Sequence, residues 1–290
     1  MMIKGDKKMT IKGDKKMTTK RVFEMFIFIL SIFILFSCKA KTPYSYKNQE
    51  LNEKYSDSSS VIEHKILIFG GKIDAKTINS SGDTIFSLSY PYIKSISIDN
   101  NKFNDDLNKI NNFIPSIISS YDSEKNFKDT NEMRDTFFND YIKNKNETKS
   151  EIPWTFDEKI TIQSAIKDKI FFKVVTDSYL GGAHPTTYTN YFGYDLINGR
   201  KISLSDIIND KEKLNEIGEK YCRIAFKLGD EPLSELGYNF PDDKFQLNDN
   251  FYLTNDSIVF YFNPYEITAY ANQQYTDIVI PLSEIGELLK

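Results

Sequence analysis

Three consecutive stretches decide the fold: residues 169–180, KIFFKVVTDSYL, residues 181–185, GGAHP, and residues 186–196, TTYTNYFGYDL. The two outer stretches are rich in aromatic and β-branched residues, which favour strands. The two glycines and the proline between them are typical of a turn. We therefore predict two strands that are joined by the 181–185 segment.

Strand patterns continue on both sides of this unit. Upstream, residues 154–166 (WTFDEKITIQSAI) predict another strand, and downstream the dipeptide Asn198-Gly199 predicts a hairpin into KISL at 201–204. Ser205 and Asp206 open a short helical turn. The apolar residues of 211–228 then recur at helical spacing. The remaining sequence predicts three strands and a terminal helix: NFYLT (250–254), SIVFYF (257–262), YTDIVIP (275–281) and LSEIGELL (282–289).

The first half has the same mixture of strands and helices. Residues 61–98 contain strand-like stretches that are separated by Gly70-Gly71 and Ser80-Ser81-Gly82, and these could form a meander. Apolar residues between 103 and 117 recur at spacings of three and four, which predicts a helix that Pro115 kinks or divides. A second, more charged helix is expected over about 123–145.

Strands in runs with a few helices between them favour an α+β fold with mainly antiparallel sheets and packed helices. Regular alternation of strands and helices, which a doubly wound parallel sheet requires, is missing. The polar segment 144–150 is the best boundary between two subdomains, residues 61–147 and 151–290. We expect the two subdomains to form one compact ectodomain.

The N-terminal region has the pattern of an export signal. Lys20 and Arg21 precede the apolar run MFIFILSIFILF at 25–36, which is long enough for a signal peptide and too short to span a bilayer. The run ends at Ser37-Cys38, which resembles the lipobox of bacterial lipoproteins. We therefore predict a signal peptide at 1–37, a lipid on Cys38 and a polar tether at 38–60. The alternative is an uncleaved anchor helix, and Met9 or Met17 could be the true start.

Composition limits the chemistry of the chain. The formal net charge is -4, and residues 1–37 hold more basic than acidic residues, so the exported part is more acidic still. An acidic surface disfavours nucleic acid and favours cationic partners. The chain has only two histidines and two cysteines and carries no metal-binding or nucleophile motif, so no metal, cofactor or catalytic residue is predicted. Cys222 is expected to be a buried structural thiol.

Three segments supply the candidate binding residues: the 181–185 loop, Tyr265-Glu266, and the aromatic stretch with Tyr188 and Tyr191, whose rings could stack on sugars or fill a protein interface. In the 181–185 loop, two glycines and a proline could present His184 in a rigid, exposed turn. The second segment is Tyr265-Glu266, which follows Pro264 at the end of a strand. The structural alternatives stay open, since the glycines could serve the backbone and the tyrosines could pack across strands. The candidate binding residues are Gly181, Gly182, His184, Pro185, Tyr188, Tyr191, Tyr265 and Glu266.

The second half, from about Ile152 to Lys290, resembles the extracellular C-terminal domain of the RsiV family of anti-sigma factors. The residues that carry the likeness are Gly181–Pro185, Tyr194–Leu196 with Gly199, Leu204–Asp206, Phe251–Thr254, Asn263–Ile267 and Ile280-Pro281. The first half resembles, more weakly, the module that precedes the catalytic domain of PdaC-type peptidoglycan deacetylases, through Tyr90-Pro91 and a helix that contains Leu107-Asn108.

The resemblance implies an envelope protein whose ectodomain binds a partner, which in the RsiV family is lysozyme. The chain has neither a sigma-binding segment nor a deacetylase domain, so neither activity is transferred. We expect a non-enzymatic, lipid-anchored envelope protein that binds a cationic protein such as lysozyme, or peptidoglycan. The alternatives are a wall- or glycan-acting hydrolase that uses a carboxylate pair, and an envelope scaffold.

Overall fold

The computed structural model describes residues 66–78, 83–98, 101–103, 107–269 and 277–290. All of these residues belong to one compact unit. The predicted signal peptide, Cys38 and the 38–60 tether lie outside the described residues. No helix within the described ranges is long and apolar enough to cross a membrane.

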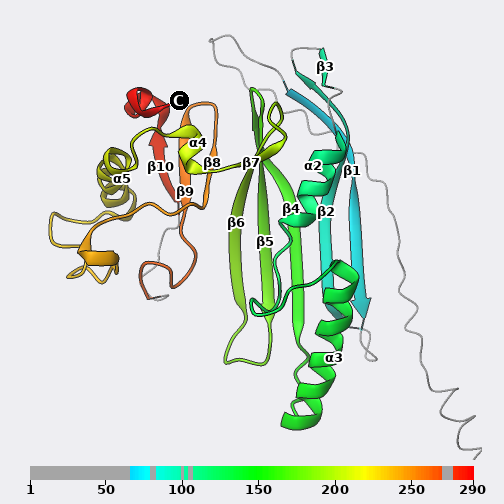
Figure 1. Cartoon of the computed structure of the whole chain (residues 1–290). Coiled ribbons are helices and arrows are strands. Elements are labelled where there is room, and N and C mark those ends of the chain that lie inside the picture. The colour runs from blue at the N-terminus through cyan, green and yellow to red at the C-terminus, as the bar shows by residue number, and fades with distance from the viewer. Residues whose placement is uncertain (1–65, 79–82, 99–100, 104–106, 270–276) are drawn as a thin grey trace, which may run out of the picture. The chain divides into compact units, whose positions relative to one another are not determined.

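A seven-stranded sheet is the centre of the fold (Figure 1). Its strand order is β1-β2-β4-β5-β6-β7, and β3 pairs with β2 outside this path. The pairing of β2 with β4 is parallel, and the other strand pairs are antiparallel. The strands are β1 (Ile66–Ile78), β2 (Thr84–Ile98), β3 (Asn101–Phe103), β4 (Thr155–Ile166), β5 (Lys169–Tyr179), β6 (Thr186–Asp195) and β7 (Arg200–Ile202).

The predicted strands at 169–180 and 186–196 form the antiparallel pair β5 and β6, with Phe172 opposite Phe192. The predicted hairpin from β6 to β7 is confirmed, because Asp195 pairs with Arg200. Gly199 lies in the turn with φ 63°, a left-handed conformation that favours glycine. The sheet also crosses the expected subdomain boundary, since β2 from the first half pairs directly with β4 from the second.

Two helices cover one face of this sheet (Figure 1). Helix α2 (Leu107–Ser116) buries Ile110 and Ile114 against β2, β4 and β5. Pro115 lies in the last turn of α2, so it ends the helix rather than dividing it. Helix α3 (Thr130–Thr148) begins at Asp129, whose carboxylate accepts from two backbone N–H groups, as an N-cap does. It buries Met133, Phe137 and Tyr141.

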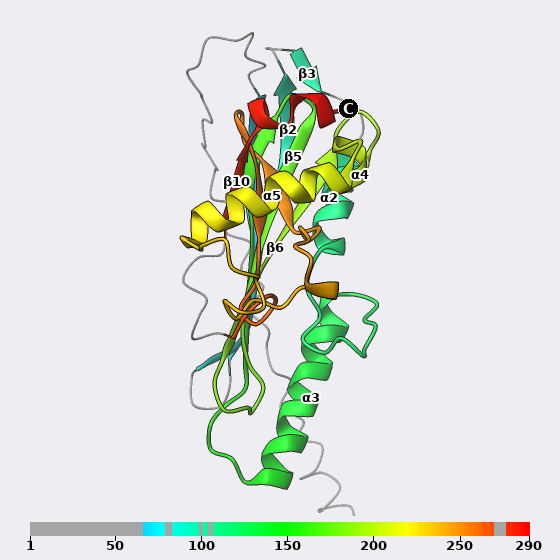
Figure 2. The same cartoon turned by 90° about the vertical axis from the view of Figure 1, so that its left-hand side faces the viewer.

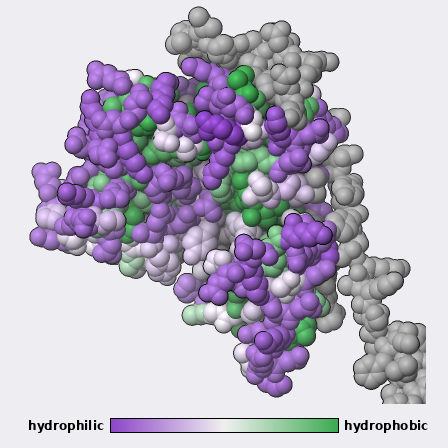
Figure 3. Space-filling model, viewed as in Figure 1, coloured by the Kyte–Doolittle hydropathy of each residue, from purple (hydrophilic) through white to green (hydrophobic). Residues whose placement is uncertain are grey.

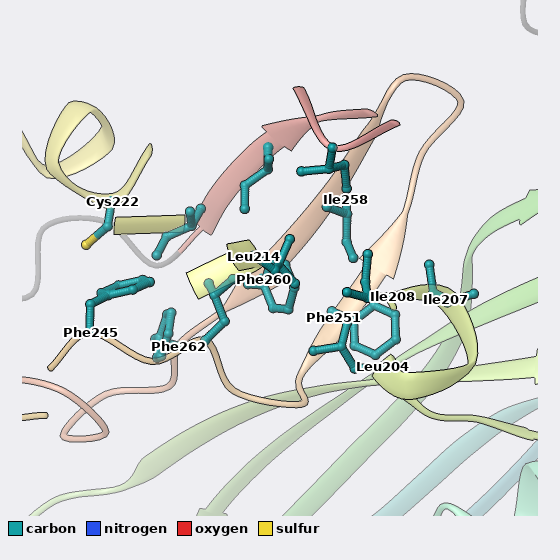
Figure 4. Packing of buried hydrophobic residues seen from close by; sticks show 14 of the residues in the cluster. Leu204, Ile207, Ile208, Leu214, Cys222, Phe245, Phe251, Ile258, Phe260 and Phe262 are labelled. Carbon is teal, nitrogen blue, oxygen red and sulfur yellow. The ribbon is translucent and has the colours of Figure 1, made fainter. Parts of the chain in front are cut away.

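The opposite face carries a second layer. The small sheet has the order β10-β9-β8, with strands β8 (Phe251–Leu253), β9 (Ser257–Tyr261) and β10 (Asp277–Pro281). Helix α4 (Leu204–Ile207) precedes helix α5 (Lys211–Phe226), and α5 lies across the strands of the small sheet (Figure 2). Figure 4 shows Leu214 and Phe260 in the apolar cluster between these elements.

Strand β5 is buried on both faces, which explains its long apolar run. Phe171 belongs to the cluster with the small sheet, whereas Phe172 belongs to the cluster under α2. The mixed architecture with mainly antiparallel sheets confirms the predicted α+β fold class.

The predicted terminal helix at 282–289 is wrong. The chain instead forms two 3-10 turns, Leu282–Glu284 and Gly286–Leu288. Leu282, Ile285 and Leu288 recur at a spacing of three, which matches the period of a 3-10 helix better than that of an α-helix. Ile285 lies between the two turns, and its φ of -121° is outside the helical range, so the turns do not join into one helix.

Candidate functional site

The turn between β5 and β6 presents the predicted loop. Gly181 has φ 88°, in the region that favours glycine. A Cβ atom at Gly181 would lie 2.9 Å from Nε1 of Trp154, so the missing side chain lets the loop pack on the indole. Gly182 needs neither a positive φ nor the space of a missing side chain. Its φ is not positive, and a Cβ atom built there would have only the carbonyl oxygen of His184 nearby, at 4.0 Å. Only the first glycine therefore has the backbone role that the sequence suggested for both.

His184 and Tyr265 come together from distant parts of the sequence. Their rings are nearly parallel, with an interplanar angle of 14° and a centroid distance of 6.5 Å. The Nδ1 atom of His184 lies 3.0 Å from the carbonyl oxygen of Pro185. Because a carbonyl only accepts, Nδ1 carries the proton in this hydrogen bond. In the neutral ring, Nε2 is then left as an acceptor.

Tyr265 is held in an unusual backbone conformation. Its φ is 68°, which is uncommon for a residue with a side chain, and the residue is 57% exposed. Strained residues of this kind persist where the surrounding structure fixes them, and they cluster at functional sites. We call the exposed rings of His184 and Tyr265 the aromatic pair.

Glu266 and Asn263 supply the contacts that fix the Tyr265 turn. Glu266 accepts from the backbone N–H of Asn263 at 2.8 Å and from the amide of Asn248 at 2.7 Å. The side chain of Asn263 accepts from the N–H of Thr189 at 2.7 Å and donates to its carbonyl at 3.1 Å. Glu266 therefore orders the turn, and Asn263 fastens it to β6.

Asn250 repeats this arrangement further along β6. Its amide accepts from the N–H of Tyr191 at 2.7 Å and donates to the carbonyl of Thr189 at 2.8 Å. Strand β7 pairs only with residues 193–195, so these asparagines satisfy backbone groups on the part of β6 that β7 leaves open. The sequence gives no sign of this role, because it depends on contacts across about 60 residues or more.

The two candidate tyrosines have different surroundings. Tyr188 is 45% exposed on β6. Tyr191 is buried. Its ring centroid lies 4.5 Å from that of Tyr252 and 5.9 Å from that of Tyr261. Burial is the main cause that raises the pKa of Tyr191. Its contacts are those of a core residue, so Tyr188 is the more accessible of the two.

A pocket of about 450 Å³ lies beside the glycine loop, and Trp154 and Leu180 line it together with residues of α3 and the 121–125 segment. On its wall, Tyr121 donates to Asp140 at 2.6 Å, and Lys125 also donates to Asp140. Burial, followed by the hydrogen bond to Asp140, raises the pKa of Tyr121 to about 12. The hydrogen bond from Lys125 lowers the pKa of Asp140.

Glu158 is an ionisable group that the sequence interpretation missed. Its side chain is 0% exposed and accepts from Thr176 at 2.7 Å and from the backbone N–H of Ser119 at 3.0 Å. Burial raises its pKa above the ordinary glutamate value. The sequence pattern does indicate this burial, because Glu158 lies between Phe156 and Ile160 on a strand face that is otherwise apolar. The contact with Ser119 holds the segment that leads to Tyr121.

Among the described residues, no group of histidine, cysteine and acidic side chains could hold a metal ion. Cys222 is buried on α5, and burial raises the pKa of its thiol to about 12, so the thiol stays protonated. Figure 3 shows hydrophobic residues in separate patches on a largely hydrophilic surface.

Comparison with known proteins gives a family label for part of the chain. Residues 205–283 match a family model described as "Protein of unknown function (DUF3298)". This segment of the chain is therefore similar to the DUF3298 family. The match spans the small sheet and α5 and excludes the glycine loop, Trp154 and α3. No curated protein is significantly similar to the chain.

Two solved structures share the fold. A DUF3298 family member from Bacteroides fragilis NCTC 9343 is 22% identical, with a TM-score of 0.52, over 84% of this chain and 96% of the other. A DUF3298 family protein from Pseudomonas aeruginosa PAO1 is 13% identical, with a TM-score of 0.57, over 78% of this chain and 94% of the other. At these identities the likeness concerns the fold alone, and it extends well beyond the DUF3298 segment.

Proposed function

We propose that the chain is a non-enzymatic envelope lipoprotein, anchored through lipid on Cys38, whose ectodomain binds a cationic protein such as lysozyme. The observation that carries the proposal is the aromatic pair. Two rings from loops about 80 residues apart are held parallel and exposed at one place on an acidic chain. Interfaces are enriched in aromatic side chains, and opposite charge speeds association.

The strain at Tyr265 supports the same proposal. Its positive φ and the locked turn beneath it keep the ring in place before any partner arrives. A ring that is ordered in advance loses less conformational entropy on binding. Peptidoglycan is the second candidate partner, favoured by the pocket of mixed aromatic and charged lining beside the loop. Hydrolase and scaffold functions lack a comparable observation.

The test uses residues 39–290, which contain every described residue. Binding of lysozyme and of peptidoglycan is measured at low and high salt, together with release of soluble wall products. We expect lysozyme binding that weakens with salt, because screening reduces attraction between exposed charges. Product release that a single acidic substitution abolishes would overturn the non-enzymatic proposal, and absence of both binding signals would favour the scaffold.

Tyr265→Gly gives a sharp variant of this test. Glycine accepts a positive φ without strain, so the variant removes the ring and keeps the turn. We expect lysozyme affinity to fall about tenfold while thermal stability is unchanged or higher. Tyr92→Ala, at another exposed aromatic, is the matched control and should bind normally. Equal loss in both variants would contradict a specific role for the aromatic pair.

A further inference from the structure

Helix α3 uses one of its faces for the core and leaves apolar side chains on a second face. Met133, Phe137 and Tyr141 are buried against the seven-stranded sheet. Phe138 and Ile142 follow the buried residues around the helix, and they are 37% and 40% exposed. Figure 1 and Figure 2 show that the C-terminal turns of α3 extend past the end of this sheet. The second face of α3 is therefore accessible to a partner.

Charged residues continue this second face toward both ends of the helix. Asp135 precedes Phe138 by three residues, and Lys145 follows Ile142 by three residues. The resulting spacing of three, four and three residues keeps all four side chains on one side of the helix, as in the seam of a coiled coil. We call Asp135, Phe138, Ile142 and Lys145 the outer stripe of α3.

The outer stripe is symmetric in position and opposite in charge. Phe138 and Ile142 each lie two residues from position 140, and the two charged residues each lie five residues from it. When a second α3 packs antiparallel about this position, Phe138 faces Ile142 of the second copy. Asp135 then faces Lys145 of the second copy. A two-fold axis repeats both contacts, as in an isologous dimer. The outer stripe is therefore complementary to itself.

Both charged members of the stripe are able to make this contact. Arg134 donates to Asp135 through Nε at 2.9 Å and through Nη2 at 2.6 Å, and both hydrogen bonds use Oδ1. Within the described part of the chain, no contact uses Oδ2 of Asp135, and the ammonium group of Lys145 takes part in no ion pair. Oδ2 can accept from Lys145 of a second copy while Arg134 keeps its own contacts.

We propose that the outer stripe is a self-association surface, on which two copies of the chain pair their α3 helices antiparallel. Removal of the apolar side chains from water drives the contact, and the two Asp–Lys pairs fix its direction and register. A parallel pair would place like charges opposite each other. The inference goes beyond the proposed function, because it needs neither the aromatic pair nor lipid on Cys38.

The size of the surface predicts a weak dimer. Helix α3 has 19 residues, which corresponds to a length of about 28 Å. A contact limited to one helix pair of this length is smaller than the roughly 1,200 Å² at which stable interfaces begin. We therefore expect a dissociation constant in the micromolar range or weaker, and a monomer at low concentration.

Sedimentation velocity of residues 39–290, over a concentration series that reaches the millimolar range, tests the proposal. We expect a reversible equilibrium between monomer and dimer. Asp135→Lys and Lys145→Asp should each weaken dimerisation about tenfold or more, because each variant places like charges opposite each other at two points. An equimolar mixture of the two variants should dimerise again, since every charged pair in the mixed dimer is opposite in sign. The variant that carries both substitutions should do the same.

Control variants separate this surface from the rest of the chain. Lys143→Asp, on the pocket side of the same helix, makes the same charge change and should leave dimerisation unaltered. Phe138→Ser should weaken dimerisation about tenfold, because it removes two of the apolar contacts. Ile224→Ser, at a residue of α5 that is 62% exposed, is the apolar control and should not. Circular dichroism confirms that each variant is folded.

Four results would overturn the proposal. They are a chain that stays monomeric at millimolar concentration, equal loss in Lys145→Asp and Lys143→Asp, a dimer that persists in Phe138→Ser, and failure of both the mixture and the double variant to dimerise. Lysozyme binding of Phe138→Ser is measured in parallel. Because the aromatic pair is intact in that variant, failure of the self-association proposal and failure of the proposed function are distinguishable.

Discussion

The two faces of the large sheet are buried in different ways. On the face with the small sheet and α5, the core cluster is apolar, with Phe260, Ile258 and Leu214 each 0% exposed. On the face with α2 and α3, polar groups interrupt the apolar packing. They are the buried carboxyl of Glu158, the Tyr121–Asp140 hydrogen bond and the indole N–H of Trp154, which has no hydrogen-bond partner among the described residues. The difference teaches that apolar packing holds the small sheet against the large one, whereas buried polar contacts help to hold α3 and the 119–125 segment.

The apolar face should be the more sensitive to loss of volume. Phe260→Ala should lower the free energy of unfolding by about 3–5 kcal/mol, because it removes buried area and leaves a cavity beside Phe251. Denaturant unfolding measures the effect. Val279→Ala, at a residue that is 46% exposed on the neighbouring strand, is the control and should change the free energy by less than about 1 kcal/mol. Similar losses in the two variants would contradict this picture of the core.

Gly181→Ala tests the wall that Trp154 forms. It places a Cβ atom 2.9 Å from Nε1 of the indole at a position with φ 88°, so we expect a loss of about 1–3 kcal/mol in the free energy of unfolding. Gly182→Ala is its neighbour and has open space, so it should be nearly neutral. Denaturant unfolding of both variants makes the comparison. A neutral Gly181→Ala would mean that the loop moves freely relative to the indole.

Glu158→Gln tests the buried carboxyl on the polar face. Burial raises the pKa of Glu158, so the folded state binds a proton more readily than the unfolded state does. The wild-type chain should therefore lose stability as pH rises from the ordinary glutamate pKa through the raised one. The glutamine variant should lack this dependence, because its side chain does not titrate.

The measurement is the free energy of unfolding of both proteins across the acidic and neutral range. Glu151→Gln, at an exposed residue, is the control and should leave the pH dependence of the wild type unchanged. Parallel curves for wild type and Glu158→Gln would show that Glu158 is not desolvated in the folded protein.

Local patterns in the sequence were enough to predict much of the fold. The β5 and β6 strands, the hairpin at Asn198-Gly199 and the amphipathic α5 all follow from residue type and spacing. The predicted helix at 282–289 was wrong because a spacing of three suits a 3-10 turn as well as an α-helix. The parallel pairing of β2 with β4 could not be predicted, since it joins residues about 70 apart that have no common local signal.

The candidate site also has parts that local sequence patterns predict and parts that they do not. The proline and glycines marked the 181–185 loop, but its proximity to Tyr265 is a tertiary contact that no local spacing encodes. The pocket depends on α3, the 121–125 segment and Trp154 at once. The helix spacing of Asp140, Lys143 and Glu147 was visible in the sequence. The pocket that this face of α3 borders could not be predicted, because its other walls come from distant segments.

Asp140→Asn should have the smallest effect of this series. The variant keeps an oxygen that accepts from Tyr121 but loses the charge that pairs with Lys125. Because this pair is partly exposed, the loss of stability should be small and should shrink as salt screens the charges. Since Lys125 holds the pKa of Asp140 below its ordinary value, the wild-type advantage should also disappear as pH falls through that lowered pKa. Unfolding midpoints at low and high salt measure the effect, with Asp135→Asn on the same helix as the exposed control. A large, salt-independent loss would mean that the network on the polar face is as essential to folding as the apolar core, and the contrast between the two faces would then fail.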